Sequence, residues 1–164
     1  MDTPGHYFPL FFHDEAVALA AGHRPCGQCR PAALAAFVTA WKVSHGISVS
    51  ASVPLRKIDQ AFHRARLIER KRRRTTEIPT LPEGAFILAP GIDKRPLLVF
   101  DGFLWPWQHG AYGAHVAFQR EAGCGILLTP EPIIAVLRAG YPLILAGQLQ
   151  RVATDEMTGK QLTA

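Results

Sequence analysis

The spacing of the apolar residues changes at a proline-containing segment, residues 79–82, and this change most limits the folds open to the chain. Before it, apolar residues recur three and four positions apart, as on one face of a helix. After it they form short runs of strand-forming residues at 85–89, 97–100 and 103–105. Helices followed by a small antiparallel meander predict an α+β protein.

Two helices are expected on either side of a Cys-x-x-Cys turn, Cys26-Gly-Gln-Cys29. The first should begin in the acidic turn 13–15 and end at Gly22, since glycine suits the backbone that follows a helix. Pro31 suits the first position of the second helix, because its missing N–H would have no partner there in any case. Gly46 should end that helix.

A third helix is expected after Pro54. Its basic residues lie off the apolar stripe and should face solvent. The preceding segment, 47–53, alternates apolar residues with serine and fits either a loop or a short edge strand. The residues expected to face the core recur at helical spacing and are Leu55, Ile58, Ala61, Phe62, Ala65 and Ile68.

The C-terminal half carries clear turn and helix signals. Asp101-Gly102 between two apolar runs predicts a tight hairpin, and Pro90-Gly91 predicts another turn. Residues 126–128 are a further candidate strand. Thr129 is expected to cap a last helix that begins with a proline and an acidic residue and is closed at 140–142.

The net charge of +5 comes from one basic segment. Between Arg56 and Arg74, nine basic and two acidic residues give +7 and leave −2 for the rest of the chain. Such a patch suits a polyanion, and it can neutralise nucleic-acid phosphates without sequence preference. A solvated, flexible helix end fits the same run of charges equally well. Phe62, and later Trp105 and Trp107, offer aromatic faces for base stacking, but nothing in the sequence places them on the basic surface, and Trp105 and Trp107 fit the core of the sheet better. The residues expected to contact DNA or RNA are Arg64, Arg70, Lys71, Arg72, Arg73 and Arg74.

The apolar runs and the cysteine count narrow the class of protein. The longest apolar runs are too short to cross a bilayer, so no membrane is expected as a partner. The first residues lack the pattern of a signal peptide, so we expect a cytoplasmic protein. Three cysteines, two of them close together, argue against a secreted disulfide framework and favour a metal, redox or incidental role.

Cys26 and Cys29 can hold one metal ion or form one small disulfide ring. Zinc prefers four ligands in a tetrahedron, and two thiolates at this spacing supply half of such a site. The chain has no second Cys-x-x-Cys pair to supply the other half. The candidates for the remaining ligands are His6, His13, His23 and Cys124.

Residues 11–31, Phe-Phe-His-Asp-Glu-Ala-Val-Ala-Leu-Ala-Ala-Gly-His-Arg-Pro-Cys-Gly-Gln-Cys-Arg-Pro, resemble the second half of the Ada-type metal-binding knuckle. The resemblance implies that Cys26 and Cys29 are zinc ligands and that the chain acts on DNA. The family's first cysteine pair is absent, so methyl transfer, which belongs to that pair, is not implied. The remainder is similar to a set of uncharacterised bacterial proteins, which implies a shared domain and no particular activity.

The expected organisation follows from these signals. It comprises an Ada-like half-knuckle and helix at 1–46, a basic helix and linker at 47–78, a β-meander with a terminal helix at 79–153, and a frayed polar tail at 154–164.

Three functions fit the sequence. The first is a non-enzymatic nucleic-acid-binding module with a structural zinc half-site at Cys26 and Cys29. The second is a thiol-disulfide oxidoreductase, because Cys-Gly-Gln-Cys before a helix resembles a thioredoxin active site and Pro79 resembles that fold's proline loop. Such a fold requires a buried strand directly before Cys26, where we expect a helix. The third is a folded protein that retains no activity.

Overall fold

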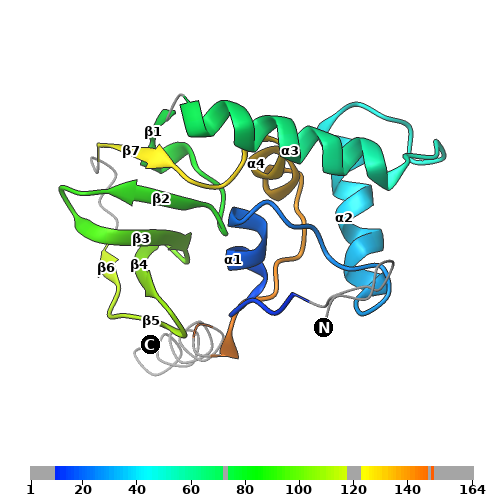
Figure 1. The fold of residues 1–164 in the computed structure, drawn as a ribbon. Coiled ribbons are helices and arrows are strands. Elements are labelled where there is room, and N and C mark those ends of the chain that lie inside the picture. Colours follow the sequence, from blue (N-terminus) through cyan, green and yellow to red (C-terminus); the bar gives the residue numbers. More distant parts are fainter. Residues whose placement is uncertain (1–9, 72–73, 118–122, 148, 150–164) are drawn as a thin grey trace, which may run out of the picture.

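The computed structural model describes residues 10–71, 74–117, 123–147 and 149, with the backbone alone for 68–71. Helices precede an antiparallel sheet and a further helix follows it, so the fold is α+β, as predicted (Figure 1). The helices are α1 (Glu15–Ala20), α2 (Pro31–Ser44), α3 (Leu55–Lys71) and α4 (Glu131–Arg138), with a short 3-10 turn, η1 (Ile78–Thr80). The strands are β1 (Thr75–Glu77), β2 (Phe86–Ala89), β3 (Asp93–Phe100), β4 (Phe103–Gln108), β5 (Ala111–Tyr112), β6 (Val116–Ala117) and β7 (Cys124–Leu127).

The sheet contains the predicted meander and extends it on both sides. Its strand order is β1-β7-β2-β3-β4-β5, and β6 also pairs with β4. The β3–β4 hairpin turns at Asp101-Gly102, where both residues have positive φ angles, 52° and 70°. A two-residue turn of this kind matches the right-handed twist of the strands. The prediction did not include β1, β5 or β6.

The boundary signals predicted for the first two helices agree with the structure. Gly22 follows α1 with a φ of +80°, Pro31 is the first residue of α2, and Gly46 follows α2 with a φ of +62°. Segment 47–53 is a loop. In α3, Ile58 and Phe62 are buried as expected, whereas the side chain of Ile68 lies outside the described part.

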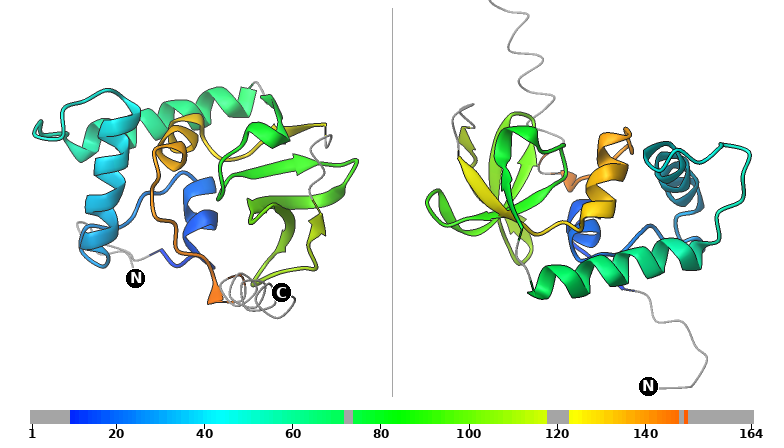
Figure 2. Two further views of the ribbon diagram at one scale, coloured as in Figure 1. Left: turned by 180° about the vertical axis from the view of Figure 1, so that it is seen from behind. Right: turned by 90° about the horizontal axis from the view of Figure 1, so that it is seen from above.

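Helices α1 and α4 lie between the sheet and α2, and α3 runs along one side of the molecule from β1 to α2 (Figures 1 and 2). The larger core cluster therefore includes side chains from the helices and from the sheet. Phe37 of α2 stands edge-on to Phe62 of α3 and to Tyr141, with ring centroids 5.9 and 5.3 Å apart. Buried aromatic pairs with this geometry add to the stability that apolar burial provides. Within the described residues, no helix has the length and apolar character needed to cross a membrane.

The predicted role of Thr129 as a helix cap is wrong. The residue at the cap position of α4 is Pro130, which makes no side-chain capping bond. Thr129 is fully buried, and its hydroxyl oxygen accepts a hydrogen bond of 2.8 Å from the backbone N–H of Phe86 in β2. A buried N–H needs a hydrogen-bond partner, and Thr129 supplies it for Phe86. This bond joins the start of α4 to the sheet.

We expect Thr129→Val to destabilise the protein by about 1–3 kcal/mol, because it leaves the buried N–H of Phe86 without an acceptor. Thr129→Ser keeps the hydroxyl and should cost less. Urea denaturation of the two variants beside the wild type measures the difference. A serine variant that loses more stability than the valine variant would show that the methyl group, and not the hydrogen bond, carries the effect.

Candidate functional site

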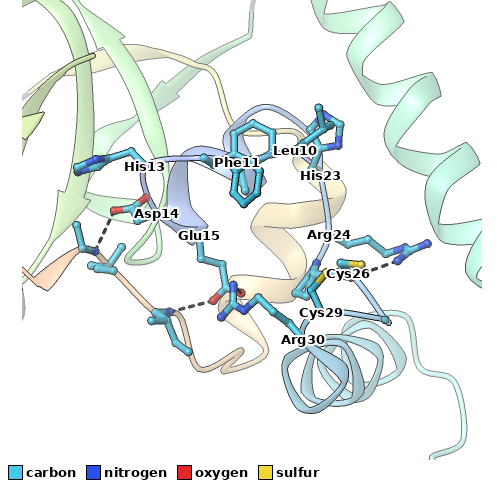
Figure 3. Close-up of a pocket in the computed structure, with 18 of the residues that line it drawn as sticks. Leu10, Phe11, His13, Asp14, Glu15, His23, Arg24, Cys26, Cys29 and Arg30 are labelled. Atoms are coloured by element: carbon cyan, nitrogen blue, oxygen red, sulfur yellow. Dashed lines mark hydrogen bonds and ion pairs between the residues drawn. The ribbon is translucent and has the colours of Figure 1, made fainter. Parts of the chain in front are cut away.

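A half-open hollow of about 990 Å³ lies beside α1, with the Cys-x-x-Cys turn on its wall (Figure 3). Most of its lining comes from residues 10–30, and α3 and the segment 144–146 complete it. Its charged, aromatic and thiol side chains are Phe11, Phe12, His13, Asp14, Glu15, His23, Arg24, Cys26, Cys29, Arg30 and Asp59. Much of the N-terminal stretch that resembles the Ada-type knuckle therefore lines one hollow.

Asp14 ties α1 to the C-terminal part of the chain. One carboxylate oxygen accepts from the backbone N–H of Val17 at 3.0 Å and so caps α1. The other accepts from the Tyr112 hydroxyl at 2.8 Å and from the N–H of Ala146 at 3.3 Å. Burial raises the pKa of Tyr112 well above its ordinary value, and the charge of Asp14 is the second largest cause. The phenol therefore stays protonated and donates its hydrogen bond.

Glu15 makes a second link of the same kind and is 5% exposed. Its Oε1 accepts from the Tyr141 hydroxyl at 2.7 Å and lies 2.8 Å from Nη1 of Arg30. Its Oε2 accepts from the N–H of Ile144 at 3.0 Å. A buried carboxylate is tolerated when its oxygens are satisfied in this way. Glu15 therefore holds together α1, the start of α2 and the C-terminal segment.

The loop between α1 and the cysteine turn is fastened to α3. The guanidinium of Arg24 binds both carboxylate oxygens of Asp59, at 2.8 and 3.0 Å. Arg66 lies so close to Gly22 that a Cβ atom there would stand 2.5 Å from its Cδ. His23 packs against Phe12 with ring centroids 5.1 Å apart. These contacts fix the direction in which the chain enters the Cys-x-x-Cys turn.

The two thiols of the turn lie together and are not joined in a disulfide. Cys26 is half-buried and Cys29 is exposed. The backbone N–H of Arg30 donates to the carbonyl of Cys26 at 2.9 Å and closes the turn. A hydrogen bond with Cys26, followed by the charge of Cys26, raises the pKa of the Cys29 thiol. The pair can therefore act as one bidentate thiol group.

The other predicted zinc ligands that lie within the described residues do not join this pair. His13 stands edge-on to Tyr112, with ring centroids 5.5 Å apart. His23 packs against Phe12, Cys124 lies in β7, and His6 is outside the described residues. Across the described ranges, no group of three or more His, Cys, Asp or Glu side chains is arranged to hold a metal ion. The donors that the structure brings together match half of a four-ligand zinc site.

The surroundings of the cysteine pair differ from those that the redox hypothesis requires. Helix α1 and an extended loop precede Cys26, where a thioredoxin-like fold would have a buried strand. Pro79 lies in η1, which does not line the hollow beside the pair. The likeness to a thioredoxin active site is therefore confined to the turn and to α2, which follows it.

The predicted nucleic-acid contacts fall partly on described residues. Arg64 is exposed on α3, and so are three further cations that the site prediction left out, Arg56, Lys57 and Arg66. Arg74 is exposed and pairs with Glu131 at 3.1 Å. The backbone of Arg70 and Lys71 belongs to α3, and the structure does not describe their side chains. Arg72 and Arg73 lie outside the described residues.

We compared the chain with models of known protein families, with curated proteins and with solved structures. None of them matches it. The function must therefore be argued from the geometry of the cysteine pair and of α3.

We expect Tyr141→Phe to destabilise the protein by about 1.5–3 kcal/mol, because it removes a hydrogen bond to the buried Glu15 carboxylate. Urea denaturation measures the loss. In a Glu15→Gln background the same substitution should cost less, since the acceptor is no longer charged. An unchanged cost in that background would contradict the role assigned to the carboxylate.

Stability should depend on pH through His23. Burial lowers the pKa of His23 below its ordinary value of 6.5, and the charge of Arg66 is the second largest cause. The unfolded chain therefore binds this proton more readily, so the His23 contribution is complete above pH 6.5 and is lost as the pH falls below it. Thermal unfolding at pH 7.5 and pH 5 should show a smaller drop for His23→Phe than for the wild type. An equal drop in both proteins would refute this assignment.

Proposed function

We propose that this protein is a non-enzymatic nucleic-acid-binding module that contacts phosphates through the exposed side of α3 and uses Cys26 and Cys29 to hold a structural zinc ion. The observation that carries the proposal is the division of α3 into two sides. Ile58 and Phe62 are buried, which anchors the helix, while the basic residues stand in solvent on the other side. An anchored helix presents its cations in fixed positions.

The carboxylate within the described part of this surface does not neutralise the exposed cations. Asp59 is exposed on α3, but both of its oxygens are already bound by Arg24 from the loop before the cysteine turn. Arg56, Lys57 and Arg64 therefore keep their charge available for an external anion. Lys57 and Arg64 are seven residues apart, which places them about two helical turns apart on one side of α3.

The burial of the aromatic residues favours binding of nucleic acid through its phosphates over binding through its bases. Phe62, which the sequence suggested as a stacking residue, is 2% exposed and packs against Phe37 and Trp41. Trp105 is buried in a second core cluster, with Phe86 and Leu98. Trp107 is partly buried against the same cluster, so all three aromatics suggested for stacking pack within the protein. Binding by charge alone predicts little preference for sequence and a strong dependence on salt.

The proposal is tested with the double variant Lys57→Gln/Arg64→Gln, measured by fluorescence anisotropy on a labelled DNA duplex over a range of NaCl concentrations. We expect weaker binding at every salt concentration. The slope of log affinity against log salt should become shallower by about 2, roughly one for each phosphate contact removed.

The matched control is Lys42→Gln/Lys94→Gln, which removes the same two charges from α2 and β3. It should keep most of the affinity and the salt slope. An equal loss in the control would show that net charge and not α3 drives binding. A wild-type protein that binds neither DNA nor RNA at low salt would refute the proposed function.

A further inference from the structure

The described part of one chain supplies only half of the zinc site in the proposed function, although the resemblance to the Ada-type knuckle implies such a site. The missing half points to a partner. Structural zinc sites are closed by four protein ligands. The fold brings Cys26 and Cys29 together. His13 and His23 line the same hollow but pack against Tyr112 and Phe12, and Cys124 lies in β7. Two thiolates with two water molecules would leave a structural site open. Further donors must therefore come from outside the described part of the chain.

We infer that one zinc ion joins two copies of this protein, with Cys26 and Cys29 of each copy as its four ligands. The inference rests on the zinc part of the proposed function. The exposed position of Cys29 leaves the pair accessible to a second copy. An identical pair supplies the same soft sulfur donors, and a two-fold axis through the metal gives both copies the same environment.

The turn is prepared for this role by the contacts on both sides of it. Arg30, directly after Cys29, is held by the buried Glu15, and Arg24, two residues before Cys26, is held by Asp59. Gly27, inside the turn, lies so close to the side chain of Leu34 that a Cβ atom there would stand 2.9 Å from it. A ligand pair that is already positioned loses little conformational freedom when it binds.

The assembly would strengthen the interaction with nucleic acid. Each copy brings one α3 with its exposed cations, so a zinc-linked dimer presents two basic helices to one duplex. When both helices engage, the second contact forms at high effective concentration and the number of neutralised phosphates rises. Zinc should then tighten binding to a long duplex and steepen its salt dependence without touching DNA itself.

The test uses the full chain, reduced and freed of metal, to which zinc chloride is added. Light scattering after size-exclusion chromatography gives the mass, and elemental analysis gives the zinc content. We expect a monomer without metal, a dimer with one zinc per two chains, and a return to monomer with EDTA. Cobalt in place of zinc should give the absorption spectrum of a tetrahedral four-thiolate site.

Two variants separate this site from other sources of dimers. Cys26→Ser/Cys29→Ser should stay monomeric and bind no stoichiometric zinc. Cys124→Ser removes an exposed thiol elsewhere, in β7, and should still form the zinc-linked dimer. One zinc per monomer, a dimer that persists without metal, or a dimer that needs Cys124 would each overturn the inference.

The outcomes also separate this inference from the proposed function. A zinc-linked dimer that fails to bind nucleic acid would sustain the inference and refute nucleic-acid binding by α3. Binding of DNA by a protein that takes up no zinc would refute the inference and the zinc site together, while leaving the role of α3 intact.

Discussion

The fold depends on two neighbouring carboxylates at the start of a six-residue helix. Asp14 and Glu15 accept hydrogen bonds from Tyr112, Tyr141 and the backbone of the segment 144–146. An isolated helix as short as α1 is not stable in water, so its position must come from such tertiary bonds. The same bonds bring the C-terminal segment against the hollow, and Glu15 also holds the side chain of Arg30, the residue after Cys29. The core and the cysteine turn therefore share one set of anchors.

Local signals in the sequence predicted much of this architecture, because each acts within a few residues. Pro31 starts α2, Gly22 follows α1, and Asp101-Gly102 makes the hairpin through backbone angles that these residues favour. Strand β1 left no such signal, since three residues at the edge of a sheet show no clear alternation. Its partner β7 lies far along the chain, and pairing between distant segments is not encoded in local spacing.

The candidate site shows the same division between local and distant information. The sequence placed Cys26 beside Cys29 and put an acidic turn at the start of α1. It could not show that Glu15 binds Tyr141, because the two residues are 126 positions apart and meet only in the folded core. It also suggested Phe62 for base stacking, yet the helical spacing that placed Phe62 on the apolar stripe of α3 already favoured its burial.

The arrangement of charges explains how one small fold can hold a thiol pair and a basic surface next to each other. Arg24 and Arg30 flank the thiols, and each is paired with a carboxylate, so the turn itself carries little net charge. By binding Arg24, Asp59 ceases to offset Arg56, Lys57 and Arg64 on the outer side of α3. A single ion pair thus both fixes the loop before Cys26 and leaves the helix basic. The metal-binding and nucleic-acid-binding roles proposed for this protein meet in that contact.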